Sequence, residues 1–141
     1  MKDWLGRFGR ARGGIAAVEF AIVSPLLLFL CLSGLILGEY LTVAHSVQQL
    51  ANEAARYSVA AGDSTAERRV LVGDFIARHA ATYPLIDPDL LSATVTPEPD
   101  NFHRVTVRYE TQQLLLSLFD RIGTFHPLAI ERAAVVRAGG F

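Results

Sequence analysis

The longest apolar stretch of the sequence runs from Ile15 to Gly38 and contains one charged side chain, Glu19. As an α-helix these residues would span about 36 Å, which is enough to cross a hydrocarbon core of about 30 Å. The apolar part of a cleaved secretory signal is shorter and ends at a small-residue cleavage site. The stretch therefore predicts a retained transmembrane helix over residues 15–38.

Small and polar residues interrupt this stretch. Pro25 removes one backbone hydrogen bond and is expected to kink or unwind the helix locally, and Ser24 is expected to supply a compensating hydrogen bond. Gly34 and Gly38 would allow a second helix to approach, although small residues are common in membrane helices generally. Cys31 is the single cysteine, so no disulfide can form within the chain, and it is expected to be a small lipid-facing or helix-packing residue.

A helical pattern continues from residue 39 to Ala61. Apolar side chains recur there at steps of three and four, which is the spacing of one face of an amphipathic helix. They are Val43, Val47, Leu50, Ala54, Tyr57 and Ala61. The helix is expected to end at Gly62-Asp63, because glycine is common just after the last helical residue. One long helix is therefore expected from Ile15 to Ala61, with its first half in lipid and its second half against a soluble domain.

A second helix is expected after this end. Ser64-Thr65-Ala66-Glu67 has the pattern of a capping box, and Tyr83-Pro84 breaks the helical pattern after about Ala81. The side chains expected to be buried are Val70, Leu71, Phe75 and Ile76.

Strand patterns fill most of the remaining chain. Ser92–Thr96 is short and β-branched, residues 97–101 have turn composition, and Phe102–Thr111 alternates, so the three together predict a β-hairpin. The hairpin residues expected on the inner face are Val105, Val107 and Tyr109. Leu114–Phe119 is expected to be a short helix or apolar loop. A last strand is expected over Leu128–Arg137, with Leu128, Ile130, Ala134 and Val136 facing the core. The fold class is α+β: a long N-terminal helix, a second helix and a small antiparallel sheet.

Composition and charge sharpen this picture. The chain is 51% hydrophobic and 19% charged, which is more apolar than an ordinary soluble domain. Residues 1–14 hold four of the 13 basic side chains and one of the 14 acidic ones, which leaves a balance of −4 for the rest. A basic segment before an apolar helix predicts a cytoplasmic N-terminus. The acidic remainder argues against a nucleic-acid partner.

No constellation of catalytic or metal-binding residues stands out. His45, His79, His103 and His126 lack metal-ligand spacing, and no Gly-rich loop opens a helix. Ser64, His79 and Asp87 have the residue types of a catalytic Ser-His-Asp triad, but nothing in the sequence brings them together. Asp87 and Asp89 flank Pro88, where a calcium site is imaginable and a solvated turn is more usual. We expect no enzyme, no metal and no cofactor.

The junction between the basic segment and the apolar stretch is unusual. Glu19 lies five residues past Gly14. A carboxylate at the start of a membrane segment is energetically unfavourable unless it pairs with another group or has a functional role. One interpretation is a carboxylate that reaches the lipid headgroups beside an uncleaved anchor. The other is that the chain is cut after Gly14, which would place Glu19 at the fifth position of the mature chain.

The residues at this junction carry a family resemblance. The segment GIAAVEF at residues 14–20 looks like the processing site of type IV prepilins. Residues 13–27 resemble the opening of TadE-like minor pseudopilins of the tight-adherence (Tad/Flp) pilus system, and VQQLANEAARY at residues 47–57 is also similar to that family. TadF proteins are short as well and remain an alternative, whereas TadG proteins are usually much longer.

The resemblance implies a processing site and a recognition site. A prepilin peptidase would cut between Gly14 and Ile15, and Glu19 with Phe20 would serve recognition and assembly. Cleavage would free the α-amine of Ile15, with a pKa near 8. In type IV filaments such an amine is thought to meet the glutamate. Many type IVa pilins begin with Phe, so methylation of Ile15 is not assumed. Major Flp pilins usually have Tyr after the glutamate and are much shorter, which favours a minor component.

The resemblance also implies an organisation and a set of partners. Residues 1–14 would be a leader, 15–38 a transmembrane helix, and 39–141 a pilin-like domain in the bacterial periplasm. The partners would be the prepilin peptidase, other pseudopilins, the major Flp pilin, the inner-membrane assembly platform and the lipid bilayer. The alternative is an unprocessed single-pass anchor that carries a periplasmic binding module.

Overall fold

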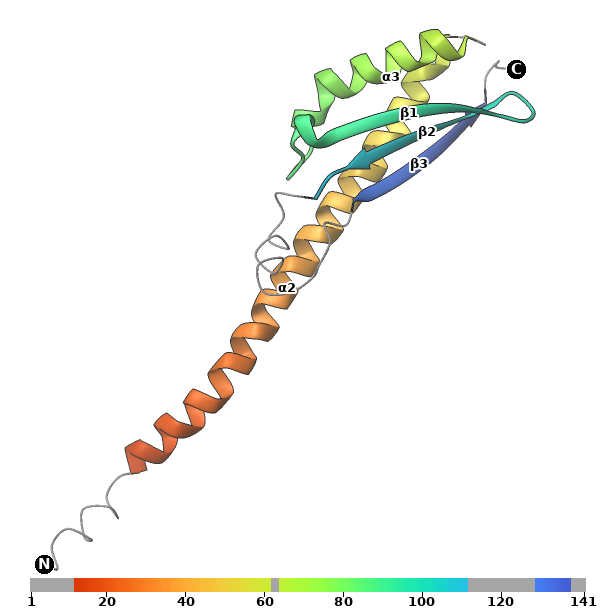
Figure 1. Cartoon of the computed structure of the whole chain (residues 1–141). Helices are drawn as coiled ribbons and strands as arrows, with labels where there is room; N and C mark the ends of the chain where they lie inside the picture. The colour runs from red at the N-terminus through yellow and green to blue at the C-terminus, as the bar shows by residue number, and fades with distance from the viewer. Residues whose placement is uncertain (1–11, 62–63, 112–128, 138–141) are drawn as a thin grey trace, which may run out of the picture. The chain divides into compact units, whose positions relative to one another are not determined.

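A computed structural model describes residues 12–61, 64–111 and 129–137, and the fold is α+β as predicted (Figure 1). The chain divides into two units, Met1–Leu37 and Gly38–Phe141. The expected segments Leu114–Phe119, Leu128 and His126 lie outside the described residues.

The first helix, α2, runs over Arg12–Tyr57 and is followed by a 3-10 helix, Ser58–Ala61. The predicted long helix over Ile15–Ala61 is therefore confirmed. Two boundaries differ: the helix begins three residues earlier, at Arg12, and its last turn tightens into a 3-10 helix. Tightened last turns are common at helix ends, where carbonyl groups lack partners.

The second helix, α3, runs over Thr65–His79 and is capped as predicted. The Ser64 hydroxyl accepts a hydrogen bond from the Glu67 amide at 3.3 Å. The Ser64 amide donates to the Ala61 carbonyl at 3.4 Å, so this structure shows the Ser64 half of the capping box. A short 3-10 helix, Ala80–Thr82, follows before the chain turns at Pro84.

One prediction for α3 is wrong. Val70 is 69% exposed, and the buried face consists instead of Arg68, Val72, Phe75 and Ile76. These four recur at steps of four, three and one, which is a single helical stripe. Leu71 is half-buried beside it. Phe75 and Ile76 are buried as predicted, whereas Arg68 and Val72 take the buried positions that the sequence analysis gave to Val70 and Leu71.

The sheet contains strands β1 (Leu91–Glu98), β2 (Phe102–Tyr109) and β3 (Ile130–Arg137), all antiparallel and in the order β1-β2-β3. The predicted hairpin is confirmed. Its turn places Asp100 and Asn101 at positive φ (58° and 61°), a conformation that these residue types tolerate better than most. The expected strand over residues 92–96 was too short, because Pro97 belongs to β1 and pairs with His103.

The register explains how β1 accommodates Pro97. The Glu110 amide donates to the Leu90 carbonyl at 3.0 Å, which makes Leu91 and Tyr109 a non-hydrogen-bonded pair. Along an antiparallel pair such positions alternate with hydrogen-bonded ones. The backbone groups of Leu91, Ala93, Val95 and Pro97 therefore face away from β2. Proline has no N–H, but at such an edge position no hydrogen bond between β1 and β2 is lost.

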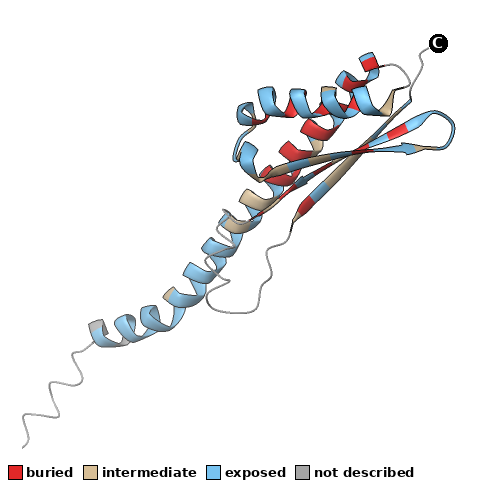
Figure 2. Cartoon of the chain, turned by 45° about the horizontal axis from the view of Figure 1, so that its top comes forward, coloured by how far each residue is buried: buried red, intermediate tan, exposed pale blue. Residues whose placement is uncertain are grey.

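The core of the second unit lies between the helices and one face of the sheet (Figure 2). Its fully buried side chains from α2 include Val43, Val47 and Leu50, as the periodicity predicted. From the sheet come Val105, Val107, Tyr109 and Ile130, also as predicted, and Ala134 and Val136 pack against them.

Candidate functional site: the amino-terminal helix

The part of α2 in the first unit exposes an apolar surface. Its most apolar window of 18 residues has a mean hydropathy of 2.6, and none of that window is buried. Nearly all of this part of the helix is drawn in the colour of exposed residues (Figure 2). The large exposed side chains include Phe20, Ile22, Leu26, Leu28, Phe29 and Leu30. An exposed apolar surface of this extent is unusual in water and ordinary in lipid. This helix is long and apolar enough to cross a membrane.

Two hydroxyl groups on α2 form hydrogen bonds within the helix. Ser33 Oγ donates to the Phe29 carbonyl and Thr42 Oγ1 donates to the Gly38 carbonyl, both at 2.8 Å. Such bonds remove the cost of placing a hydroxyl in hydrocarbon. The prediction for Ser24 is not confirmed: Pro25 lies inside the helix, but within the described residues Ser24 makes no hydrogen bond of this kind.

Gly34 and Gly38 leave the helix surface open. A Cβ atom built at either glycine would meet nothing within 4 Å. Cys31 is exposed on the same helix and is a free thiol. A second helix could therefore approach at Gly34 and Gly38 without a steric barrier from this chain's described residues.

The junction residues lie near the start of α2. Gly14 and Glu19 are exposed, and Phe20 is 70% exposed. Helix positions 15 and 19 are one turn apart, about 6 Å along the axis, and share a face. Among the described residues no cation forms an ion pair with Glu19. The structure thus brings Ile15 and Glu19 to neighbouring positions, and the Glu19 carboxylate is available to another group.

In the second unit, α2 is held by polar as well as apolar contacts. Burial raises the pKa of Tyr83 to about 12, with further contributions from its hydrogen bond with Glu53 and from the charge of that carboxylate. Gln48 Nε2 donates to the Ala133 carbonyl of β3 at 3.4 Å. Neither contact is visible in the sequence pattern, because both join residues distant in the chain.

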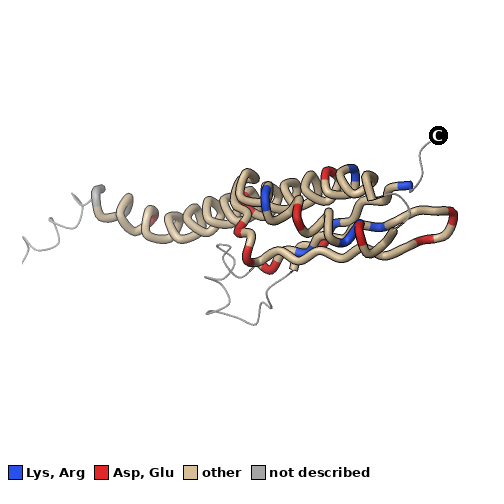
Figure 3. Tube along the Cα trace, turned by 90° about the horizontal axis from the view of Figure 1, so that it is seen from above, with Lys and Arg blue, Asp and Glu red and all other residues tan. Residues whose placement is uncertain are grey.

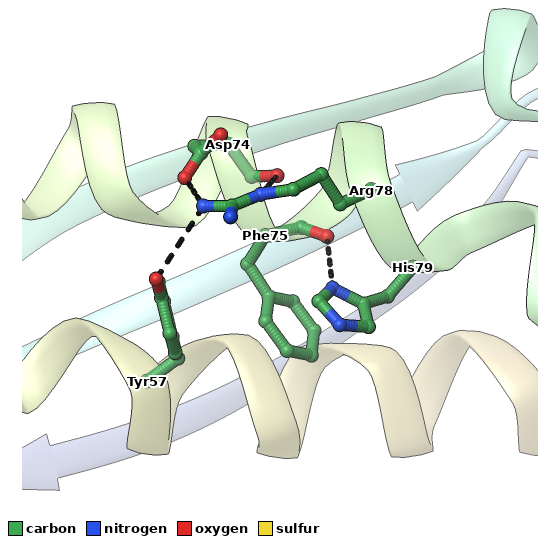
Figure 4. Close-up of polar contacts among 5 residues, drawn as sticks. All are labelled: Tyr57, Asp74, Phe75, Arg78 and His79. Carbon is green, nitrogen blue, oxygen red and sulfur yellow. Dashed lines mark hydrogen bonds and ion pairs between the residues drawn. The ribbon is translucent and has the colours of Figure 1, made fainter.

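An aromatic and charged cluster joins α2 to α3 (Figure 4). The Phe75 ring lies against Tyr57, with centroids 5.4 Å apart, and stacks on His79 at 4.4 Å. Arg78 forms an ion pair with Asp74 and approaches the Tyr57 hydroxyl at 3.5 Å. His79 Nδ1 lies 3.0 Å from the Phe75 carbonyl. These contacts fix His79 as a packing residue at the end of α3.

A buried arginine holds the end of α2. Arg68 is fully buried, and its Nη1 donates to the Ser58 carbonyl at 2.9 Å and to Ser58 Oγ at 3.2 Å. Ser58 Oγ in turn donates to the Ala55 carbonyl at 2.7 Å. Sequence reasoning missed this contact. The available signal was that Arg68 continues the stripe of Val72, Phe75 and Ile76.

The other polar residues considered in the sequence have local structural roles. The Asp87 carboxylate accepts a hydrogen bond from the Asp89 amide at 3.0 Å and so caps a 3-10 turn. Ser64 and His79 flank opposite ends of α3, so the structure does not bring the triad together. His103 is buried, with Nε2 3.3 Å from Thr65 Oγ1. Within the described residues no group of three or more His, Cys, Asp or Glu side chains could hold a metal ion.

Charged residues concentrate in the second unit, along α3 and the sheet (Figure 3). On the outer sheet face they pair: Arg104 with Glu98 at 2.5 Å, and Arg108 with Glu110 at 2.9 Å. The Glu110 hydrogen bond and charge raise the pKa of Arg108. Such exposed pairs contribute little to stability. The two units thus differ sharply in surface chemistry.

These features define a class: an α+β protein whose long N-terminal helix fits a membrane anchor. Residues 14–56 match the model of the family described as TadE-like protein. The match confirms the predicted resemblance over the segment that contains the junction and most of α2. It implies a protein associated with the Tad pilus. No curated protein and no solved structure matches the chain significantly.

Proposed function

We propose that this chain is a minor pseudopilin that a prepilin peptidase cuts between Gly14 and Ile15, and that then primes or supports assembly of a Tad/Flp pilus used in surface adherence. The observation that carries the proposal is the coincidence of three features in one segment. Residues 14–56 match the TadE-like family, the exposed apolar helix lies within them, and Glu19 stands one turn from the proposed new terminus.

The proposed cleavage changes the electrostatics of the helix start. It removes the basic leader and leaves 127 of the 141 residues, beginning at the Ile15 amine. That amine is a cation below its pKa of about 8 and can pair with a Glu19 carboxylate, in the same or in a neighbouring subunit. Pairing offsets the desolvation free energy of holding either charge among apolar helices. It also favours one axial position of a helix relative to its neighbour.

The proposal assigns a topology and partners. The basic leader favours a cytoplasmic N-terminus, which would place residues 39–141 in the periplasm. The exposed apolar helix would pack against other pseudopilins and the major Flp pilin after leaving the inner-membrane assembly platform. This role requires neither a catalytic group nor a cofactor. Gly34 and Gly38 offer an open helix surface for such packing.

The test is the N-terminal sequence of the membrane-extracted protein, measured by mass spectrometry in cells with and without the prepilin peptidase. We expect a chain that starts at Ile15 with the peptidase and at the leader without it. Gly14→Ala should accumulate the longer form and abolish pili, while Gly34→Ala serves as a matched control that leaves processing intact. A full-length N-terminus in cells that contain the peptidase would favour the alternative, an unprocessed anchor with a periplasmic binding module.

A second variant separates processing from assembly. Glu19→Gln removes the charge and keeps the size of the side chain, so we expect cleavage to continue and the number of pili to fall. Glu131→Gln makes the same change at an exposed position of β3 in the second unit and should leave piliation unchanged. Normal piliation with Glu19→Gln would contradict the proposed pairing of the amine and the carboxylate.

A further inference from the structure

A groove opens between α3 and the edge strand β1 within the second unit. Val72, Gly73 and Ile76 line it from the helix, and Leu91 and Ala93 from the strand. Its volume is about 290 Å³. Pockets for drug-sized ligands typically measure about 300–1,000 Å³, so this groove has room for a few apolar side chains rather than for a large cofactor.

The helix wall of this groove is built from small residues where it is open. Gly73 and Ala77 are exposed, and a Cβ atom built at Gly73 would meet nothing within 4 Å. Glycine within a helix costs about 1 kcal/mol relative to alanine, so its presence here needs a compensating use. An incoming side chain that fills the space beside Gly73 would supply one.

The strand wall presents unpaired backbone groups. The backbone of Ala93 and Val95 faces away from β2, as the register requires. The neighbouring edge positions offer no donor, because the Leu91 amide already donates to the Pro88 carbonyl and Pro97 has no N–H. Val95 is only 4% exposed, whereas Ala93 is half-buried, so Ala93 provides the accessible N–H.

The opposite edge of the sheet is different. The Ala133 carbonyl of β3 faces outward and accepts a hydrogen bond from Gln48 of α2 at 3.4 Å. Within the described residues no side chain donates to the outward carbonyls of β1 in this way. An edge strand with unpaired groups is a template for another strand, and among the residues that the structure describes nothing covers the edge of β1 in this way.

One cation lies in the groove. Arg69 is exposed, and among the described residues it forms no ion pair. Its neighbours on α3 already use their charges, since Asp74 pairs with Arg78 and Arg68 is buried against Ser58. Arg69 therefore offers a positive group to a ligand in an otherwise apolar groove, and the complementary chemistry is a carboxylate.

We propose that this groove binds an extended segment of a partner polypeptide, which adds to the sheet as a fourth strand beside β1. Alternate apolar side chains of the segment would enter the space between α3 and β1, and an acidic residue at one end would pair with Arg69. Backbone bonds to the edge would supply affinity, and the groove with Arg69 would supply specificity, as in strand addition generally. The proposal is independent of processing at Gly14.

The test uses the full chain in mild detergent and four dye-labelled peptides of eight residues. Each alternates valine and threonine, and carries aspartate or lysine at its amino or carboxyl end. Fluorescence anisotropy should show that one of the aspartate peptides binds about fivefold more tightly than its lysine counterpart, the size expected for an exposed ion pair. Arg69→Gln should remove this difference.

Two further variants test the edge and the groove. Ala93→Pro removes the accessible N–H without breaking a bond to β2 and should weaken binding about tenfold. Val135→Pro removes an outward N–H from β3 and should leave binding unchanged. Gly73→Leu should fill the groove and block the peptide, with circular dichroism showing that the fold persists. Equal binding of the aspartate and lysine peptides, or full binding by Ala93→Pro, would overturn the proposal.

Discussion

The two halves of α2 use similar residues for opposite purposes. Residues 16–37 are almost all apolar, with Glu19 as their one charged side chain, and most of them are exposed, whereas residues 43–55 are apolar on one face and that face is buried. The first half needs an apolar medium around it, and the second half carries its own apolar environment in the form of α3 and the sheet. Helical periodicity, rather than total hydrophobicity, separates the two.

The polar groups of the two halves follow the same division. Ser33 satisfies its hydroxyl within the helix, by donating to the carbonyl four residues earlier. Gln48 and Glu53 instead reach Ala133 and Tyr83, which belong to other elements. Lipid offers no hydrogen-bonding group, so the polar side chains of a helix in lipid bond to the helix itself. The polar side chains of a helix packed in a domain can instead form hydrogen bonds with neighbouring elements.

The largest expected effect comes from truncating the same residue type in each half. Leu50→Ala should lower the free energy of unfolding of the second unit by about 2–5 kcal/mol, because Leu50 is fully buried. Leu30→Ala, at an exposed position, should change it by less than about 0.5 kcal/mol. Urea titration in mild detergent, followed by near-ultraviolet circular dichroism of the tyrosines, measures both. Equal losses in the free energy of unfolding for the two substitutions would contradict the difference between the two halves of α2.

Adjacent arginines provide a second pair. Arg68→Ala should cost about 1.5–3 kcal/mol, since it removes charged hydrogen bonds to the buried Ser58. Arg69→Ala, one residue along and exposed, should be neutral within about 0.5 kcal/mol. The same titration compares them. An equal cost for both substitutions would show that the end of α2 is not held through Arg68.

Two serines sharpen the contrast in hydrogen bonding. Ser64→Ala removes the cap of α3 and should lower the free energy of unfolding by about 1 kcal/mol. Ser33→Ala removes a hydroxyl whose bond stays within its own helix and should leave the second unit unchanged. If thermal melts monitored by circular dichroism showed a loss at Ser33 and none at Ser64, our account of the cap would be wrong.

The smallest effect is a dependence on alkaline pH. The folded-state pKa of Tyr83 is raised to about 12 from an ordinary value of 10.0, so the neutral phenol is favoured in the folded chain. The resulting stability is fully present below pH 10 and is lost as the pH rises from 10 towards 12. Tyr83→Phe should flatten this part of the profile, measured as urea midpoints by far-ultraviolet circular dichroism. Glu53→Gln should reduce it.

Local patterns in the sequence were sufficient to predict most of the fold. The apolar stretch, the spacing of Val43, Val47 and Leu50, the serine cap and the alternation of β2 each predicted the element that the structure contains. The junction at Gly14 and the family resemblance were also evident, because they depend on contiguous residues. The family match over residues 14–56 covers this part of the chain.

What could not be predicted depends on contacts between distant residues. Val70 and Val72 are the same residue type, and only the packing of α3 decides which is buried. Arg68 lies in the core because Ser58 is there to accept its hydrogen bonds. Pro97 belongs to a strand because its position faces outward from the ladder, which depends on register. The groove beside β1 depends on the same packing of α3, because Val72 lines it together with Leu91 and Ala93 of β1.

The spacing of donors on β1 limits what can grow from it. The Leu91 amide is engaged by Pro88, and Pro97 has none, so the exposed edge carries donors over a span of only three residues. Such an edge can hold a short guest strand but cannot propagate a continuous sheet from one molecule to the next, which is the route to amyloid-like aggregation. Growth of a sheet from this edge would therefore stop after one short guest strand.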